Sequence, residues 1–292
     1  MNAEDRPVPR PYVATSVATG VLTVIATAVG LFVPGFYRDA PVLLPQVYGQ
    51  DLLTLAVAVP AFVVSLFYAT RGSLRGYVMW LGVTGYLLYT YASYAFMTAF
   101  NELYLVYVAL LWLTLFTFVG GMVRLDAVAL KRAVGDGPVR SYVAFQALLV
   151  ALVGVLWLSE IVPASVAGTV PESVADAGLP TSVIYSLDLG VVLPAFALSA
   201  YLLRQRRPWG YAFTAVLLVK AATLGGAVLS MIWFMAADGQ PVVLPQVVIF
   251  GLLTLLSVGL MARLLLSIER SRTVDHSPKS DGPPTEERSS GG

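Results

Sequence analysis

One lysine lies deep inside an apolar stretch of the chain. Lys220 falls within YAFTAVLLVKAATLGGAVLSM, about eleven residues from the nearer polar flank, which places it about 16 Å deep if the stretch is a membrane-spanning helix. A charge at that depth costs about 2.5–3.5 kcal/mol on insertion scales, so an ionisable residue there indicates a functional site by default. Its ammonium group needs a counter-ion or a water-filled cavity.

Asp188 is the acid that the sequence offers as a partner for Lys220. It begins the preceding apolar stretch, about sixteen residues ahead of Arg204, so its depth overlaps the reach of an extended lysine. The short RQRRP connection makes the two stretches antiparallel neighbours. Three roles stay open for this lysine: an ion pair that only fixes helix packing, a charge pair lining a solute or proton path, and a lysine that faces lipid headgroups.

Further acids gather on the side where Asp188 begins its stretch. Asp51 stands at the start of another apolar run, where it either faces the same cavity as Asp188 or only complements a helix dipole. Asn101 and Glu102 form a very short turn, and Glu160 ends a further run. Such an acidic rim could attract cations, or it could be what remains when basic residues are kept on the other side.

Tyrosines accompany these acids in GYLLYTYASYAF. Tyrosines near a membrane face commonly form an interfacial belt. Tyr86, however, lies nearer the middle of its run. A pocket lined by Tyr86, Tyr89 and Lys220 is the alternative that we carry forward.

The elements that position these residues are membrane-spanning helices. The chain has 292 residues, of which 58% are hydrophobic and only 12% charged, far from the composition of a soluble domain. Apolar runs long enough to cross about 30 Å of hydrocarbon recur along it. We expect eight spans, at residues 13–33, 52–70, 77–100, 103–123, 142–162, 183–203, 209–235 and 244–266. The predicted fold is an all-α polytopic membrane bundle.

Basic residues assign the loops to sides. With the N-terminus inside, sixteen of the eighteen lysines and arginines fall on inside segments, and the outside loops hold only Arg38. We therefore expect a multi-pass protein of the plasma membrane with both ends cytoplasmic. Residues 1–12 form the N-terminal segment, residues 13–267 the bundle, and residues 268–292 a polar tail that we predict to be disordered.

An internal repeat is suggested by an offset of 134 residues. It matches PAF at residues 60–62 and 194–196 and gives eight identities over 41 gapless positions. The halves would be residues 13–123 and 142–267, both beginning inside, which is a parallel four-plus-four arrangement. YGQD and YSLD, which end at Asp51 and Asp188, match only if a gap is allowed.

Two similar stretches, PVLLPQV and PVVLPQV, are offset by 200 residues and so lie outside that repeat. Both precede a span that starts on the outside. A proline in the first turn of a helix is tolerated because its missing N–H would be unbonded there. The two stretches are either independent helix starts or the related lips of one outward opening.

Several kinds of chemistry have no residues to support them. The chain has no cysteine, and its one histidine, His276, falls in the tail, so we expect neither a metal site nor a cofactor. A lysine in the seventh span is also found in retinal proteins. We reject that interpretation because an eighth span follows the lysine and both ends of the chain are expected inside. No glycine-rich nucleotide loop and no basic patch interleaved with aromatics is present, so nucleic acid is not an expected partner.

Three successive segments carry a resemblance: YGQDLLTL, RGSLRGYVMWLGVTGYLLYTYASYAF and FNELYLVYVALL. Together they resemble a pattern of bacterial and archaeal polytopic membrane proteins without an assigned activity. The resemblance covers about a quarter of the chain. It implies a membrane protein and draws attention to Asp51, Gly72, Gly76 and Asn101.

The expected function is the binding or transport of a small solute or ion at an outward-opening polar site. Its candidate residues are Asp51, Asp188, Lys220, Tyr86, Asn101 and Glu102. The alternatives are a membrane-embedded enzyme for a lipidic or quinone-like substrate, in which carboxylates act as acid or base, and a non-catalytic sensor or assembly protein. The lipid bilayer is the expected partner in every case.

Overall fold

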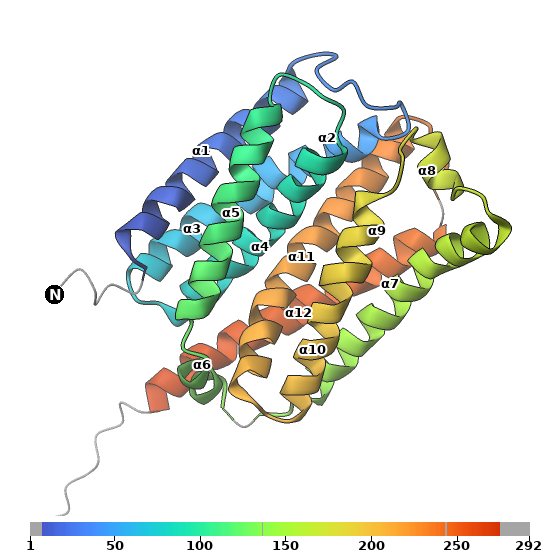
Figure 1. The fold of residues 1–292 in the computed structure, drawn as a ribbon. Coiled ribbons are helices and arrows are strands. Elements are labelled where there is room, and N and C mark those ends of the chain that lie inside the picture. The colour runs from blue at the N-terminus through green and yellow to red at the C-terminus, as the bar shows by residue number, and fades with distance from the viewer. Residues whose placement is uncertain (1–7, 136, 243, 275–292) are drawn as a thin grey trace, which may run out of the picture.

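The computed structural model describes residues 8–135, 137–242 and 244–274, with side chains as far as residue 268, and every regular element in these ranges is helical (Figure 1). The elements are α1 (Arg10–Phe32), α2 (Leu44–Leu53), the π-helical η2 (Thr54–Ala58), α3 (Val59–Thr70), α4 (Leu74–Met97), α5 (Tyr104–Arg124), α6 (Ala127–Val134), α7 (Arg140–Ala167), α8 (Glu172–Asp176), α9 (Val183–Leu187), the π-helical η3 (Asp188–Val192), α10 (Leu193–Arg204), α11 (Pro208–Ala237) and α12 (Leu244–Val274).

Seven spans in the described part of the chain are long and apolar enough to cross a membrane. They are Arg10–Phe32, Leu44–Thr70, Tyr104–Arg124, Arg140–Ala167, Val183–Arg204, Pro208–Ala237 and Leu244–Ile268. The predicted all-α polytopic bundle is thus confirmed. The remaining expected span corresponds to α4, whose 24 residues reach about 36 Å but which is not among the seven.

Helix α4 is more polar than the others because protein, rather than lipid, surrounds it. It contacts α3, α5 and α11, and 15 of its 24 residues are buried. Trp80 and Tyr86 are fully enclosed. Aromatic residues with polar tips are accommodated there since neighbouring helices supply hydrogen-bond partners. The polar groups of the candidate site are arranged around this helix.

Some helix boundaries differ from those expected. The second span begins at Leu44 instead of residue 52, because LPQVYGQD, residues 44–51, forms the first turns of α2 against α11 rather than a loop in water. Helix α12 continues to Val274, so residues 268–274 of the predicted tail are helical. The rest of that tail, with His276, and residues 1–7 of the N-terminal segment lie outside the described residues.

The backbone repeats at an offset of 134 residues. Segments η2 and η3 are separated by that number, as are α3 and α10 and the starts of α4 and α11. Even the turns correspond: Gly72 has a φ of +84° and Arg206 a φ of +54°, and Arg206 is the one non-glycine with positive φ in the described ranges. The gapless alignment therefore matches the structure. The gapped pairing of YGQD with YSLD does not, since Thr54 is the residue that corresponds to Asp188.

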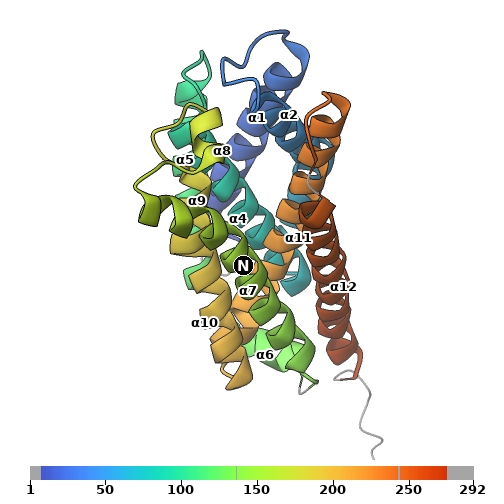
Figure 2. The ribbon, with the colours of Figure 1, turned by 90° about the vertical axis from the view of Figure 1, so that its right-hand side faces the viewer.

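The two ends of the bundle carry opposite charges. The start of α1, helix α6 and the end of α12 lie together at one end, while α8 lies at the other (Figures 1 and 2). We call the first the basic end, defined by Arg10, Arg71, Arg75, Arg124, Lys131, Arg132, Arg140, Arg204, Arg206, Arg207 and Arg263. The opposite, acidic end is defined by Asp39, Glu102, Glu160, Glu172, Asp176 and Asp238.

The two PVxLPQV stretches come close to each other at the acidic end. Gln240, just ahead of the second stretch, donates from Nε2 to the carbonyl of Pro41, the first residue of the other stretch, at 3.2 Å. This contact brings together the end of the α1–α2 connection and the α11–α12 turn. The interpretation as two lips of one opening stays a prediction.

Candidate functional site

The site is built where the membrane-spanning helix α9–η3–α10 widens. Pro194 has no N–H and its ring would clash with the carbonyl four residues earlier, so the ordinary α-helical ladder cannot continue through it. The helix widens instead, and the N–H of Leu193 bonds the carbonyl of Asp188, five residues back. Such π-helical turns are frequent at functional sites. Here the turn begins at Asp188.

Two helices hold the Asp188 carboxylate, which is only 7% exposed. Tyr89 of α4 donates from its hydroxyl to Oδ1 at 3.0 Å. Trp157 of α7 donates from its indole N–H to Oδ2 at 2.8 Å. Each carboxylate oxygen therefore already accepts one hydrogen bond from the protein, which fixes the orientation of the group.

Lys220 of α11 lies beside the same tyrosine. Its Nζ is 4.2 Å from the centroid of the Tyr89 ring, a cation–π distance, and the side chain is 6% exposed. Nζ has no hydrogen-bond partner among the described residues, Asp188 included. The lysine and the aspartate are thus neighbours around Tyr89 and not a directly bonded ion pair. An ammonium group has three donors, and here all three are unused.

A cavity of about 60 Å³ adjoins both charges. Asp188 and Lys220 are its two ionisable lining residues, and its remaining walls are almost wholly apolar, with Phe196 of α10, Leu149 of α7 and Phe250 of α12 among them. The space is enough for a few waters or a small polar group. Every lining residue belongs to a membrane-spanning helix, so the cavity as described does not include the loops of the acidic end.

The corresponding place in the first half is filled. There Thr54, at the start of η2, shares a hydrogen bond of 2.7 Å with the hydroxyl of Tyr86, the residue that corresponds to Lys220. Gln50 donates to Tyr86 and to Thr90, at 2.8 Å each. Tyr86 therefore belongs to this neutral cluster, and of the predicted tyrosine pocket Tyr89 contacts Lys220.

Asp51 directly follows Gln50 of that cluster and is 1% exposed. It accepts hydrogen bonds from the hydroxyls of Tyr37 at 2.5 Å and Tyr94 at 2.9 Å. A side chain on Gly30 would collide with both the carboxylate and Tyr37, so this glycine makes their approach possible. The carboxylate is enclosed within the first half and does not line the cavity of Asp188.

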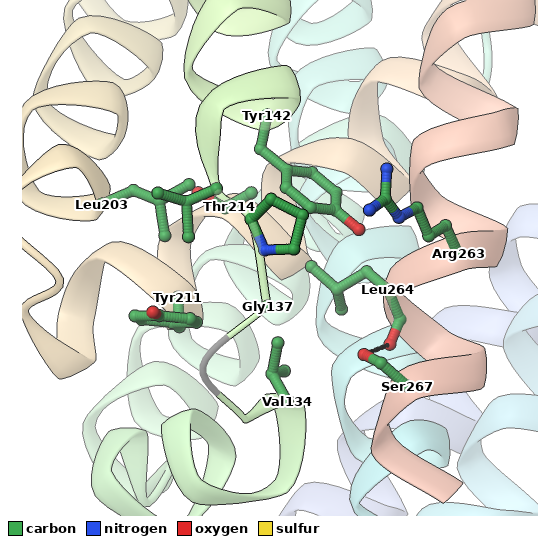
Figure 3. A pocket seen from close by; sticks show the side chains of 11 residues that line it. Val134, Gly137, Tyr142, Leu203, Tyr211, Thr214, Arg263, Leu264 and Ser267 are labelled. Carbon is green, nitrogen blue, oxygen red and sulfur yellow. Dashed lines mark hydrogen bonds between the residues drawn. The ribbon is translucent and has the colours of Figure 1, made fainter. Parts of the chain in front are cut away.

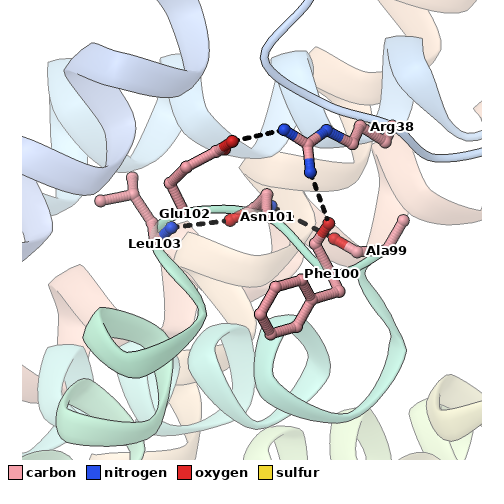
Figure 4. Close-up of polar contacts among 6 residues, drawn as sticks. All are labelled: Arg38, Ala99, Phe100, Asn101, Glu102 and Leu103. Atoms are coloured by element: carbon pink, nitrogen blue, oxygen red, sulfur yellow. Dashed lines mark hydrogen bonds and ion pairs between the residues drawn. The ribbon is translucent and has the colours of Figure 1, made fainter.

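Asn101 and Glu102 form the connection between α4 and α5 (Figure 4). The Asn101 side chain accepts from the N–H of Leu103 at 3.0 Å and donates to the carbonyl of Ala99 at 3.3 Å. Exposed Glu102 forms an ion pair with Arg38, which also donates to the Phe100 carbonyl. The contacts of Asn101 and Glu102 thus hold a turn at the acidic end, away from Lys220.

Some residues of the site were not evident from the sequence. Trp157 gave no signal beyond being an indole in an apolar run. Thr54, four residues after Gln50, did give a signal in the sequence. The gapless repeat places Thr54 opposite Asp188, which predicts a neutral counterpart of the charged site in the first half. In the described part of the chain, no group of three or more histidine, cysteine, aspartate or glutamate residues is placed to hold a metal ion.

Comparison with known proteins adds no relative. No protein-family model, no curated protein and no solved structure matches the chain. The resemblance described from the sequence stays a prediction, and the chemistry of the site has to be inferred from its own contacts.

Proposed function

We propose that this multi-pass membrane protein binds and transports a small solute whose hydrogen-bond acceptor group engages Lys220. A solute with a carboxylate or another anionic or carbonyl group has the required chemistry. The alternatives, an enzyme for a lipidic substrate and a sensor, have no specific contact in their favour.

The observation that carries the proposal is the unused ammonium group of Lys220 beside a cavity. A buried donor without a partner costs about 1–3 kcal/mol, and more when it is charged. A lysine kept only for packing would be expected to bond its neighbouring carboxylate directly. Asp188 instead accepts from Tyr89 and Trp157, which leaves the ammonium free to bond a ligand.

The apolar walls restrict the kind of solute. Phe196, Leu193 and Val153 contribute hydrocarbon surface to the cavity and no hydrogen-bonding side chain. Specificity in such pockets comes from a few placed polar groups, while the walls contribute affinity through burial of apolar surface. A small molecule with an apolar body and one acceptor group therefore fits better than a sugar, which would need many polar partners.

Transport also requires a direction. The basic end fits the cytoplasmic side of the plasma membrane under the positive-inside rule, so the acidic end would face outward. The cavity lies among the spans, and its lining reaches neither end. We propose that it opens alternately to the two sides, with the second-half helices that line it moving against the first half.

The test begins with thermal unfolding of the purified protein against a panel of short-chain carboxylates, amino acids and amines. Compounds that raise Tm are then assayed for uptake into proteoliposomes. We expect Lys220→Met to lose both responses. Tyr86→Phe, at the corresponding position of the first half, is the matched control and should keep them.

A second variant covers the case in which Lys220→Met does not fold. Asp188→Asn keeps the size of the side chain and removes its charge, and we expect it to change the affinity for the same compounds. Full uptake by a folded Lys220→Met protein would refute the proposal, as would a panel in which no compound raises Tm.

A further inference from the structure

A second cavity, of about 130 Å³, lies at the basic end (Figure 3). It is formed where residues 137–139, just ahead of α7, meet α10, α11 and α12. Most of its walls are apolar, with Val134, Val139, Leu203 and Leu264 among them. None of its lining residues lines the cavity of Asp188 and Lys220, so it is a separate site.

One polar group in this cavity has no partner. Tyr211 of α11 is only 2% exposed, and its hydroxyl makes no hydrogen bond with the described residues. The corresponding residue of the first half, Tyr77, donates to the carbonyl of Gly121 at 2.9 Å. The same tyrosine is therefore satisfied within the protein in one half and left with an unused donor beside a cavity in the other.

A positive charge lies across the cavity from this hydroxyl. Arg263 of α12 also lines the cavity, and its guanidinium carbon is 6.0 Å from the centroid of the Tyr142 ring. Figure 3 shows Arg263 beside the Tyr142 hydroxyl, with Tyr211 on the opposite side of the view. Ser267, on the next turn of α12, already donates its hydroxyl to the carbonyl of Leu264. A guanidinium group is suited to a phosphate.

We propose that this cavity binds the phosphate of an anionic membrane lipid at the basic end of the bundle. Basic pockets between spans on the cytoplasmic side are suited to acidic headgroups. The apolar walls favour a lipid over free phosphate, because they can cover the glycerol and the first methylene groups of an acyl chain. Arg263 neutralises the charge of the phosphate, while Tyr211, on the opposite side of the cavity, donates to an ester oxygen of the same lipid.

The test compares purified protein in nanodiscs of phosphatidylcholine alone with nanodiscs that also contain phosphatidylglycerol. We expect phosphatidylglycerol to raise Tm of the wild type, and native mass spectrometry to show retained phosphatidylglycerol. Arg263→Gln should weaken retention about fivefold, the effect of losing about 1 kcal/mol. Tyr211→Phe removes only the hydroxyl and should weaken retention about fivefold, because a neutral hydrogen bond is lost.

Matched controls separate this site from general surface charge. Arg204→Gln removes an exposed charge at the same end, and Tyr77→Phe removes the corresponding hydroxyl of the first half; both should retain the lipid like the wild type. Equal losses in Arg204→Gln and Arg263→Gln would overturn the proposal. So would a rise in Tm with inorganic phosphate alone that matches the rise with phosphatidylglycerol, since that result would assign the cavity to a free anion.

Discussion

In the first half of the bundle, Thr54 bonds Tyr86 directly, whereas in the second half the corresponding residues, Asp188 and Lys220, are charged and do not bond each other. The backbones around the two pairs are alike: in each, a π-helical turn precedes a proline, and the N–H of the residue before that proline bonds a carbonyl five residues back. The difference therefore lies in the side chains alone.

The contrast extends to the basic end. Tyr77 uses its hydroxyl within the protein and Tyr211 does not. In both comparisons the first half satisfies its polar groups internally, while the second half leaves donors beside a cavity. Under the functions proposed above, these first-half positions stabilise the bundle, and the corresponding second-half positions bind ligands at some cost in stability.

The similarity of the two backbones can be tested at the α3–α4 and α10–α11 turns, where we expect the largest effects on stability. A methyl group on Gly76 would lie 2.8 Å from the backbone nitrogen of Ala69, and one on Gly210 would lie 2.5 Å from the carbonyl carbon of Leu202. Gly76→Ala and Gly210→Ala should each lower the free energy of unfolding by about 3 kcal/mol, measured by denaturation in mixed micelles.

Gly259 provides the control for these turns, because a methyl group there would meet no atom within 4 Å. Gly259→Ala should be neutral or slightly stabilising, since alanine favours a helix over glycine. A large loss in only one of the two hairpin variants would show that the two turns are not equivalent.

The stabilising role of the first half is tested by Asp51→Leu. This change leaves the buried hydroxyl of Tyr37 without its acceptor, and leaves the Tyr94 hydroxyl only the Val47 carbonyl at 3.3 Å. We expect a loss of about 2 kcal/mol in the free energy of unfolding, because a stranded hydroxyl costs about 1–3 kcal/mol and hydrogen bonds inside membranes lie toward the low end. Asp238→Leu, at an exposed turn, should have little effect. Equal stability of the Asp51 variant and the wild type would show that Asp51 does not stabilise the bundle.

Substitutions at the corresponding positions Tyr86 and Lys220 should change the free energy of unfolding in opposite directions. Lys220→Met removes a buried ammonium group without a hydrogen-bond partner, while Asp188 keeps its hydrogen bonds from Tyr89 and Trp157. It should raise the free energy of unfolding by about 1 kcal/mol in the absence of ligand. Tyr86→Phe leaves Gln50 and Thr54 short of a partner and should lower it by about 1 kcal/mol. Thermal unfolding of both variants in one detergent measures the pair. A destabilised Lys220→Met protein would indicate that the lysine is structural.

The sequence predicted the spans well, because burial in lipid requires long apolar runs whatever the tertiary fold. It predicted the boundaries around Asp51 less well. Residues 44–51 contain proline, glutamine and tyrosine and resemble a loop, yet they form a helix packed against α11, where neighbours satisfy their polar groups. Helix α4 shows the same limit, since hydropathy describes contact with lipid and not contact with other helices.

The sequence indicated the charged residues of the site, but it did not indicate which other residues contact them. Lys220 and Asp188 were indicated by their depth alone, and both line one cavity. That Tyr89 and Trp157 would hold Asp188 depends on how α4 and α7 approach η3, which no local pattern encodes. The offset of 134 residues carried more information than its eight identities suggested, because those identities include the prolines at the two π-helical turns, Pro60 and Pro194, and the glycines of the two close turns, Gly76 and Gly210.

The smallest expected effects on stability lie at the acidic end of the first half, where the pKa values of two acids are shifted in opposite directions. Burial raises the pKa of Asp39, so its charge lowers stability above that pKa and the penalty disappears as the pH falls below about 4. A hydrogen bond from its own backbone N–H and, after it, Arg38 lower the pKa of Glu102. Its stabilising contribution is present above about pH 4.5 and is lost on acidification.

Asp39→Asn should therefore raise Tm at pH 7 and not at pH 4, whereas Glu102→Gln should lower Tm slightly at pH 7 and not below the pKa of Glu102. Parallel Tm profiles for the two variants from pH 7 to pH 3 would contradict this assignment.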